Sequence, residues 1–393
     1  MNLAAPRVLF AGYNGAENTG AEARLLTIIE DVRAVLGPAA VITIPTLNAA
    51  ALRRYLTETA TLRIESVPPL FPAAVRRLVR ANDALVLVEG STFMDTWTPA
   101  LLWFFLWAVR CAHAAGKPVL AYAVDAGRLS WANRLHVRRE ASRAALISVR
   151  SYAAAKRLSD AGVSARIEVT ADPAFLFDSG AMPPRRPIAG FAPVDFWLWP
   201  VVIRPWAPQA RCYRWPYYFS SSRERRRAAR AHAAALAAEA DRMVSLYNRD
   251  VALIAMEALD EPIARDVLAR MRHGSRARLY SAREHSASEM TALLRSLELL
   301  VTSRYHAAVL SMPAAVPQIA IGHDQRISGL YGEMGLERWC FPWDAEGLWP
   351  AVRAAADALI ASPDSQRDLL RAGCERQMAR ARRNRDLLRS FFA

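Results

Sequence analysis

Residues 299–329 read LLVTSRYHAAVLSMPAAVPQIAIGHDQRISG, and this stretch decides the fold class of the chain. The short apolar runs Leu299–Val301 and Gln318–Ile321 predict two buried strands, because each is short and bounded by polar or turn residues. An alanine-rich stretch with a helical pattern lies between them. A strand, a helix and a second strand in this order predict a parallel βαβ unit.

Polar residues follow both of these predicted strands. Ser303, Arg304 and His306 come after the first strand, and Arg326 comes after the second. The carboxyl ends of parallel strands meet at one edge of a sheet, which is where ligands bind in open α/β folds. Two arginines and an imidazole at such an edge indicate an anionic substrate that requires a proton.

The same alternation of short apolar runs and helical patterns extends along the chain and predicts an α/β fold. It indicates two Rossmann-like, doubly wound domains that face a cleft. A proline-rich break, SGAMPPRRP at residues 179–187, separates them and divides the chain into domains at 1–183 and 184–363, followed by a basic helix at 364–393. The predicted strands are Val8–Ala11, Val41–Ile44, Leu62–Val67, Ala84–Val88, Val119–Ala123, Leu146–Val149 and Ile167–Thr170 in the first domain, and Ile188–Phe191, Val201–Arg204, Val251–Ala255, Leu279–Tyr280, Leu299–Thr302 and Gln318–Ile321 in the second.

The composition is that of a globular protein with acidic partners. The 393 residues are 53% hydrophobic and 22% charged, which excludes a disordered chain. The net charge of +14 suits nucleic acid, an anionic membrane surface or phosphorylated substrates, and does not choose among them. Four widely spaced cysteines without a CxxC pair argue against a disulfide framework and against a metal site.

No signal peptide and no membrane-spanning segment are predicted, so we expect a cytoplasmic protein. The amino terminus lacks a basic region followed by a long apolar segment. The longest apolar run, Pro99–Val109, is shorter than the roughly 20 residues that span a bilayer. We interpret it as a buried helix, and the alternative is a helix whose tryptophans contact lipid headgroups.

Two loops after predicted strands of the first domain carry candidate binding residues. Residues 12–22, GYNGAENTGAE, open a helix, where backbone amides can bind an anion or sugar hydroxyls. The spacing is not GxGxxG, so a dinucleotide fingerprint is absent. Asn14, Asn18 and Glu22 are the candidates in this loop, and Ser91 is the candidate in the loop after the fourth strand. The alternative for both loops is a plain strand-to-helix turn.

Arg150 directly follows the buried strand Leu146–Val149 and is predicted to lie at the same ligand edge. A guanidinium at that position suits bidentate binding of a carboxylate or a phosphate. The later segment TADPAF contains Asp172, which would either orient Arg150 or cap a turn.

The region Phe196–Phe219 is irregular and rich in tryptophan, tyrosine and proline. Its prolines forbid a continuous helix or a central strand. Two interpretations stay open: an aromatic loop that contacts a sugar ring or a membrane surface, and aromatic side chains that fill the core between the domains. The adjacent arginine-rich run, Arg223–Arg230, is interpreted as a solvated helix face, and the alternative is a surface that binds nucleic acid.

Together these motifs resemble the polysaccharide pyruvyl transferase family. The resemblance covers about residues 8–360 and rests on GYNGAENTGAEA, SVRSYAAAKRLSDAGV, TADPAF, SRYHAAVLSMPAAVP and GHDQRISGL. It implies a two-domain fold similar to that of GT-B glycosyltransferases. It also implies transfer of a pyruvyl group from phosphoenolpyruvate to a sugar, with formation of a ketal.

The resemblance also implies roles for individual residues. His306 matches the general acid of the family, and Arg150, Arg304 and Arg326 match positions that bind phosphoenolpyruvate. The first domain would be the acceptor side and the second the donor side. Phosphoenolpyruvate is then the donor substrate, and no metal or other cofactor is expected. Because clustered arginines lower the pKa of an imidazolium, we expect His306 to become an effective acid when the donor binds.

The chain departs from the family pattern in its first domain. Ala21 stands where the family commonly has aspartate, and Glu89-Gly90-Ser91 stands where it usually has three glycines. The usual glutamine-containing strand end is replaced by residues 124–128, VDAGR. All three changes concern the acceptor side, so the acceptor stays open.

Two alternatives to pyruvyl transfer stay open. One is a nucleotide-sugar glycosyltransferase on the same fold, and another is a non-catalytic glycan-binding protein. The expected partners are phosphoenolpyruvate and a sugar or lipid-linked glycan, and no nucleic acid is expected. The basic charge and the tryptophans further suggest peripheral contact with the inner face of the cell membrane.

Overall fold

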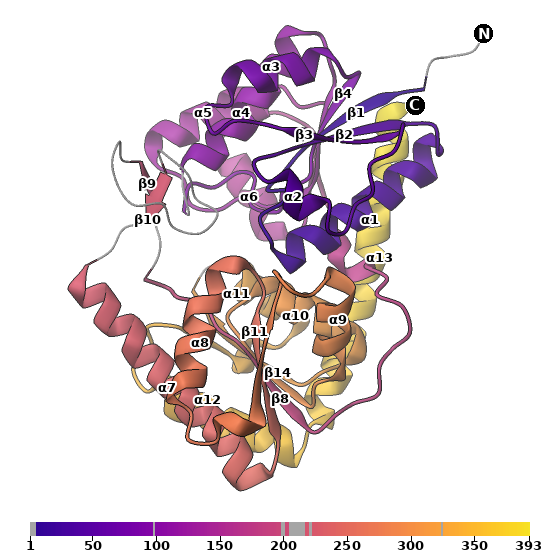
Figure 1. The fold of residues 1–393 in the computed structure, drawn as a ribbon. Coiled ribbons are helices and arrows are strands. Elements are labelled where there is room, and N and C mark those ends of the chain that lie inside the picture. The colour runs from indigo at the N-terminus through magenta and orange to yellow at the C-terminus, as the bar shows by residue number, and fades with distance from the viewer. Residues whose placement is uncertain (1–4, 97–98, 198–200, 204–216, 220–221, 324) are drawn as a thin grey trace.

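The computed structural model describes the chain except for residues 1–4, 97–98, 198–200, 204–216, 220–221 and 324 (Figure 1). It has two α/β domains, one above the other, each built on a parallel sheet with helices on both faces. The long helix α13 (Asp364–Phe392) begins beside the lower domain and ends beside the upper one. The predicted fold class, two Rossmann-like domains, is confirmed.

The amino-terminal sheet has seven parallel strands in the order β3-β2-β1-β4-β5-β6-β7. The chain starts at β1, moves outward to β3 and returns to β4, so its topological switch point lies between β1 and β4. The strands are β1 (Arg7–Ala11), β2 (Val41–Thr46), β3 (Leu62–Ser66), β4 (Ala84–Leu87), β5 (Val119–Val124), β6 (Leu146–Val149) and β7 (Ile167–Val169). The helices are α1 (Thr19–Leu36), α2 (Ala49–Leu52), α3 (Pro72–Arg80), α4 (Pro99–Ala114), α5 (Trp131–Ala141) and α6 (Tyr152–Asp160).

Both faces of this sheet are buried, which is why its strands are apolar throughout. Val8 and Phe10 of β1 belong to one core cluster, together with residues of α1 and α13. Leu9 and Ala11 belong to a second cluster, on the face covered by α3, α4 and α6. Successive side chains of a strand point to opposite faces, so a continuous apolar run fills two cores.

The carboxy-terminal sheet has six parallel strands in the order β12-β11-β8-β13-β14-β15. Its switch point lies between β8 and β13, and β13 is the first strand of the stretch 299–329. The strands are β8 (Ile188–Ala192), β11 (Asp250–Ala255), β12 (Ala277–Ser281), β13 (Leu299–Thr302), β14 (Gln318–Gly322) and β15 (Cys340–Pro342). The helices are α7 (Arg223–Tyr247), α8 (Glu261–Arg270), α9 (Ala287–Ser296), α10 (Tyr305–Ser311), α11 (Gln325–Met334) and α12 (Leu348–Ala361).

Two features of this domain differ from the sequence-based expectation. The predicted strand Val201–Arg204 does not join the main sheet, because β9 (Val201–Ile203) pairs antiparallel with β10 (Tyr217–Phe219) in a separate sheet. In the sequence it stands between Pro200 and Pro205, and proline lacks the N–H that a central strand needs. The edge strand β15 was not predicted, because its three residues give no periodic signal.

The boundary predicted between residues 183 and 184 falls between β7, which ends at Val169, and β8, which begins at Ile188. Most of the aromatic region Phe196–Phe219 lies outside the described residues, so its two interpretations stay as predictions. The described residues at the start of this region pack into the second domain. Phe196 lies 5.2 Å from Trp343 and 5.0 Å from His232, measured between ring centroids.

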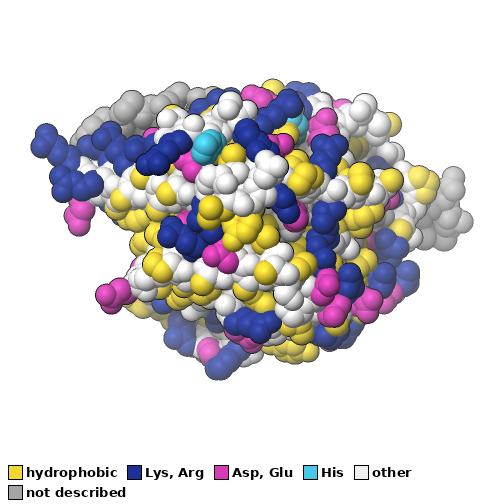
Figure 2. All heavy atoms as spheres, turned by 90° about the horizontal axis from the view of Figure 1, so that it is seen from below, with side chains coloured by type: hydrophobic (Ala, Val, Ile, Leu, Met, Phe, Trp, Pro, Cys, Tyr) yellow, Lys and Arg dark blue, Asp and Glu magenta, His cyan; other side chains and the backbone are white. Residues whose placement is uncertain are grey.

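Positive side chains are spread over the face of the molecule that is turned to the viewer in Figure 2. Figure 2 shows arginine and lysine side chains clustered at the end of the molecule where α7 begins, and elsewhere mixed with acidic and apolar side chains. The exposed arginines of the first turns of α7 are Arg223, Arg226, Arg227 and Arg230. No described helix is both long enough and apolar enough to cross a membrane.

Candidate functional site

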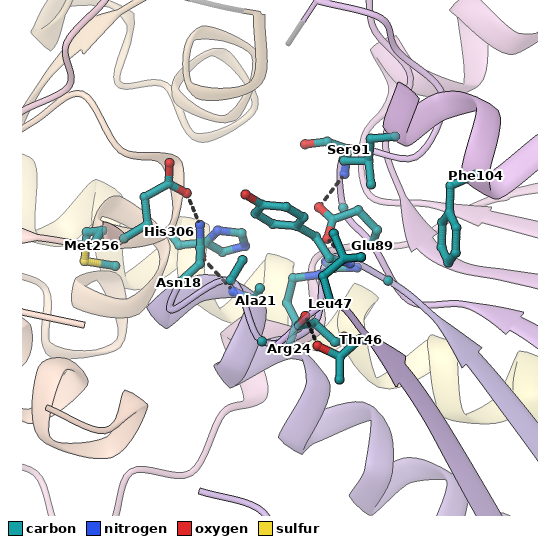
Figure 3. Close-up of a pocket in the computed structure, with 18 of the residues that line it drawn as sticks. Asn18, Ala21, Arg24, Thr46, Leu47, Glu89, Ser91, Phe104, Met256 and His306 are labelled. Carbon is teal, nitrogen blue, oxygen red and sulfur yellow. Dashed lines mark hydrogen bonds between the residues drawn. The ribbon is translucent and has the colours of Figure 1, made fainter. Parts of the chain in front are cut away.

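A cavity of about 340 Å³ lies between the two domains, at the carboxyl ends of both sheets (Figure 3). Its walls come from residues after β1, β2, β3, β4 and β6 of one domain, with the start of α4, and after β11, β13 and β14 of the other. The topological switch points of the two sheets therefore face each other across the cavity. Eight residues predicted from the sequence line this cavity: Asn14, Asn18, Ser91, Arg150, Ser303, Arg304, His306 and Arg326.

His306 lies in the first turn of α10, directly after β13. Its Nε2 is 3.5 Å from the Oδ2 of Asp172. Burial lowers the pKa of His306, and the nearby charges of Arg150 and Arg24 lower it further, while the Asp172 carboxylate opposes them. The lowered pKa makes this imidazole a weaker base than a free histidine, and burial contributes more to the shift than the arginines do.

The start of α1 holds this imidazole in place. A Cβ atom on Gly20 would stand 2.1 Å from the Nδ1 of His306, a separation that two atoms cannot adopt. Only a glycine at this position allows the helix of one domain to pack against the histidine of the other.

Asp172 is the centre of the buried charges behind His306. Its Oδ2 lies 2.8 Å from the Nη1 of Arg24 and 2.7 Å from the Nη1 of Arg150. Its Oδ1 accepts a hydrogen bond of 3.0 Å from the Ala174 N–H. Burial opposes ionisation, but Arg24, then His306 and Arg150, hold the pKa of this carboxyl well below its usual range. Asp172 therefore both orients Arg150 and caps a turn, so the two alternatives are both correct.

Arg24 was not selected from the sequence, although it is one of the largest fully buried side chains of the protein. It reaches from α1 to the carbonyl oxygens of Val88 and Ala123, at 3.3 and 3.1 Å. An arginine one turn after the glycine-rich loop was the available signal, because such a residue faces the same sheet edge as the loop.

Arg150 is also buried and ion-paired. Its Nε donates to Asp125 at 2.9 Å, and its guanidinium lies 4.2 Å from the centre of the Tyr305 ring. Its Nη2 atom is buried and has no hydrogen-bond partner among the described residues. One donor of Arg150 thus stays available at the wall of the cavity.

Arg304 forms its ion pairs within its own domain. It donates to Asp260 at 2.7 Å and to Glu257 at 2.8 Å, both in the loop that follows β11. Its charge is therefore balanced before any substrate binds, and burial raises the pKa of Asp260 to about 7 even though Arg304 opposes this.

Glu257 also joins the two domains. Its Oε2 accepts a hydrogen bond of 2.5 Å from the Asn18 side chain, and the backbones of Asn18 and Glu257 form an antiparallel bridge. The N–H of Thr19 donates to the Met256 carbonyl at 2.9 Å. Figure 3 shows Asn18, Met256 and His306 together on this side of the cavity. The first loop of the chain thus fixes the spacing of the domains at the site.

Arg326 reaches across the cavity from the second domain to the first. Its Nη1 donates to the Oγ of Ser91 at 2.9 Å. The Ser91 N–H in turn donates to the Oε1 of Glu89 at 3.0 Å, and the Tyr13 N–H donates to the Oε2 of Glu89 at 3.2 Å. Glu89 lines the cavity and was not selected from the sequence.

Asn14 and Ser303 complete the set. Asn14 is buried, its carbonyl accepts from the Thr46 hydroxyl at 2.8 Å, and its side-chain Nδ2 has no partner among the described residues. Ser303 is buried at the end of β13, where its N–H donates to the Ala192 carbonyl.

Glu22 is the predicted binding residue that the structure places elsewhere. It is not among the residues that line the cavity, whereas its neighbour Ala21 is. Consecutive residues of a helix point in directions about 100° apart, so one faces the cavity and the other the domain junction. Burial raises the pKa of Glu22 to about 8, Arg54 opposes the shift, and Glu17 adds to it.

The wall farthest from His306 is apolar. Phe71 and Phe104 meet edge to face with ring centroids 5.4 Å apart, and Leu101 lies beside them in the lining. Helix α4, predicted as a buried helix, buries most of its apolar side chains in the core. The indole N–H of Trp103, which is 43% exposed, donates to Asn133 at 2.9 Å.

The arrangement combines a histidine, several guanidinium groups and two carboxylates, Glu89 and Glu257, in one cavity that residues of both domains line. It can bind an anion, deliver a proton and accept one. Among the described residues, no group of three or more His, Cys, Asp or Glu side chains is placed to hold a metal ion.

Known structures share this fold. The UDP-GlcNAc 2-epimerase from Neisseria meningitidis superposes with a TM-score of 0.61 at 7% identity, covering 98% of this chain and 99% of that chain. The UDP-GlcNAc 2-epimerase from Methanocaldococcus jannaschii gives 0.56 at 9% identity, with coverages of 90% and 92%. The α,α-trehalose-phosphate synthase from Burkholderia vietnamiensis gives 0.53 at 11% identity, with coverages of 99% and 98%. At such identities the likeness shows a common GT-B-like fold alone.

Sequence comparison identifies the family. No curated protein was found to match the chain. The family profile described as polysaccharide pyruvyl transferase matches residues 18–325, which include the switch point of the second sheet, between β8 and β13, and the cavity residues from Asn18 to His323. The chain belongs to the polysaccharide pyruvyl transferase family.

Proposed function

We propose that this protein transfers the pyruvyl group of phosphoenolpyruvate to a sugar of a polysaccharide or glycan precursor and forms a ketal. The observation that carries the proposal is His306, held beside Asp172, Arg150 and Arg24 in a cavity between the domains. Protonation of the methylene carbon of phosphoenolpyruvate needs a proton donor that works near neutral pH, and an imidazolium is suited to this.

The cations of the cavity suit the two anionic groups of phosphoenolpyruvate. The buried Nη2 of Arg150 offers a donor without a partner, and Arg326 approaches from the opposite domain. Charge-assisted hydrogen bonds to the carboxylate and the phosphate would stabilise both the bound donor and the departing phosphate. A bound anion also raises the pKa of His306, which burial lowers in the unliganded protein. Donor binding would thus prepare the acid.

The acceptor sugar would lie toward the first domain. Phe71 and Phe104 offer an aromatic wall for the apolar face of a sugar ring or for a lipid-linked group. Peripheral membrane contact is part of the proposal, because Trp131 is 79% exposed and the surface carries excess positive charge. Sedimentation with anionic liposomes tests it, and a protein that stays in the supernatant rejects this part.

Isothermal calorimetry with phosphoenolpyruvate is the direct test of the donor. Arg304→Ala is a poor probe, since it leaves the carboxylates of Asp260 and Glu257 without their cation. Arg326→Ala removes a cation that is hydrogen-bonded to the Ser91 hydroxyl, and Ser91→Ala is its matched control. We expect the wild type to bind, Arg326→Ala to bind about 10-fold or more weakly, as loss of a charged hydrogen bond predicts, and Ser91→Ala to bind nearly as well as the wild type. A wild type that does not bind phosphoenolpyruvate rejects the proposal.

The product distinguishes this reaction from its alternatives. A pyruvyl ketal and a transferred hexose add different masses to the glycan, so mass spectrometry separates a pyruvyl transferase from a nucleotide-sugar glycosyltransferase. Donor binding without any product would instead favour a binding protein. His306→Asn should retain donor binding and lose turnover by about 10²–10⁴-fold, the range expected for loss of a general acid.

A further inference from the structure

Ketal formation requires a base as well as an acid. Two hydroxyl groups of the acceptor must each lose a proton, and His306 is occupied as the donor of a proton to carbon. We propose that Glu89 is the base that accepts the proton of the attacking acceptor hydroxyl. This assignment rests on the proposed function and adds the residue that activates the acceptor.

The carboxylates of the cavity point to Glu89. Among the described residues that line the cavity, Glu89 and Glu257 are the two with a carboxylate. Glu257 is neutralised by Arg304 and also accepts from Asn18, so both of its oxygens are engaged in holding the domains together. Asp172 and Asp125 lie behind Arg150 and are not part of the lining. No ion pair with a described cation engages Glu89.

The local structure fixes the Glu89 carboxylate without neutralising it. The N–H groups of Tyr13 and Ser91 each donate to one of its oxygens, at 3.2 and 3.0 Å. Each carboxylate oxygen can accept two hydrogen bonds, so each keeps acceptor capacity for a substrate hydroxyl. Gly90 allows the Arg150 guanidinium to pack against this loop, because a Cβ there would lie 2.8 Å from the Nη1 of Arg150.

Glu89 also lies on the correct side of the cavity. Figure 3 shows it with Ser91 and Leu47 on the wall of the first domain, while His306 lies across the view with Asn18. An acid and a base on opposite walls can act on the two ends of one double bond: the acid gives a proton to C3, and the base takes the proton of the hydroxyl that bonds to C2. Ala21, which also lines the cavity, has no polar side-chain atom to compete for this role.

The atoms balance as follows. The hydroxyl oxygen bonds to C2 of phosphoenolpyruvate, Glu89 takes its proton, and the π electrons of C2=C3 bind the proton that His306 gives to C3. The bond from C2 to the phosphate oxygen then breaks, the second hydroxyl bonds to C2, and its proton leaves with the phosphate. Glu89 releases its proton to solvent and His306 regains one, so no further reactant is needed.

Chemical rescue of Glu89→Ala tests the assignment. The substrates are phosphoenolpyruvate and the total glycan extracted from cells that lack this chain, and the readouts are phosphate release and ketal detected by mass spectrometry. We expect Glu89→Ala to lose about 10²–10⁴-fold in kcat, as loss of a general base predicts, with unchanged affinity for phosphoenolpyruvate in calorimetry. Sodium formate should restore turnover, and Glu89→Asp should retain part of it.

A second anion, nitrate, distinguishes a structural role of the Glu89 carboxylate from a role as a base. Nitrate has the planar shape of formate and accepts hydrogen bonds from the N–H groups of Tyr13 and Ser91, but it is not a base. Rescue by formate and not by nitrate supports the assignment, whereas equal rescue, no rescue by formate or full activity of Glu89→Ala overturns it. Glu65→Ala, a partly exposed carboxylate of β3 paired with Arg77, serves as the control and should keep the wild-type rate.

The two proposals fail in distinguishable ways. If the wild type forms no ketal from this glycan, the proposed function and the role of Glu89 both fall. If the wild type forms the ketal and Glu89→Ala does so equally well, only the role of Glu89 falls.

Discussion

At the scale of single residues, the site depends on glycines as much as on charged groups. Gly20 has no room for a Cβ, because that atom would overlap the His306 imidazole at 2.1 Å. We expect Gly20→Ala to displace the ring or the helix start and to reduce turnover by about 10²-fold or more, as a misplacement of about 1 Å does. A steady-state assay of phosphate release from phosphoenolpyruvate with acceptor glycan measures it.

Gly329→Ala is the matched control for this substitution. Gly329 lies within α11, and nothing stands within 4 Å of a Cβ placed there. Alanine also has the higher helix propensity, so the control should keep wild-type turnover and gain slightly in stability. Equal turnover of Gly20→Ala and Gly329→Ala would contradict the proposed role of His306.

The sequence predicts the ends of buried strands better than the partners of the side chains found there. Arg150 and His306 follow continuous apolar runs, and the structure places both at the cavity. The ion pairs of Arg24 with Asp172 and of Arg304 with Asp260 join residues far apart in the chain, so no local pattern reports them. Such pairs become visible only in the folded structure, where each domain brings distant segments of the chain together.

At the scale of elements, the start of α1 shows that a sequence motif does not give the direction in which each helix side chain points. Ala21 faces the cavity, while Glu22 is buried away from it. The sequence places both in one loop–helix start and cannot tell which of them faces a ligand. Helix starts, by contrast, follow local residue types: Ser286 caps α9 and forms a capping box with Glu289, a pair that sequence alone can indicate.

The buried carboxyl of Glu22 makes stability depend on pH. Burial raises its pKa from 4.5 to about 8, so between these values the folded chain holds a proton that the unfolded chain has lost. Stability from this group is therefore complete below about pH 4.5 and falls as the pH rises toward 8. Glu22→Gln cannot ionise and should be more stable than the wild type by roughly 3 kcal/mol at pH 7.

Urea unfolding of Glu22→Gln between pH 5 and pH 8 measures this difference. The gap between variant and wild type should widen as the pH rises, in the direction that the raised pKa dictates. Glu65→Gln, which changes a partly exposed carboxyl on β3, should show no such widening. A constant gap across the range would mean that Glu22 is ionised in the folded protein.

At the scale of the whole molecule, α13 joins the two domains and contacts the backbone next to the site. Near its start, the Gln366 side chain accepts from the N–H of Gln318 at 2.7 Å and donates to its carbonyl at 2.8 Å. Near its end, Asn384 donates to the Ala171 carbonyl at 2.9 Å, and Arg380 donates to the Thr170 carbonyl. The last two contacts hold the backbone that delivers Asp172 to the cavity.

Leu388 attaches the end of α13 to the first domain, because it is fully buried in the core cluster that contains Val8 and Phe10. Leu388→Ala should lower the free energy of unfolding by about 2–5 kcal/mol, the usual cost of removing a buried leucine side chain. Leu369→Ala, at a 37% exposed position of the same helix, should cost far less. Since α13 links the domains, we expect calorimetry of Leu388→Ala to show the first domain unfolding before the second. A single transition at the wild-type temperature would mean that the end of α13 carries none of this coupling.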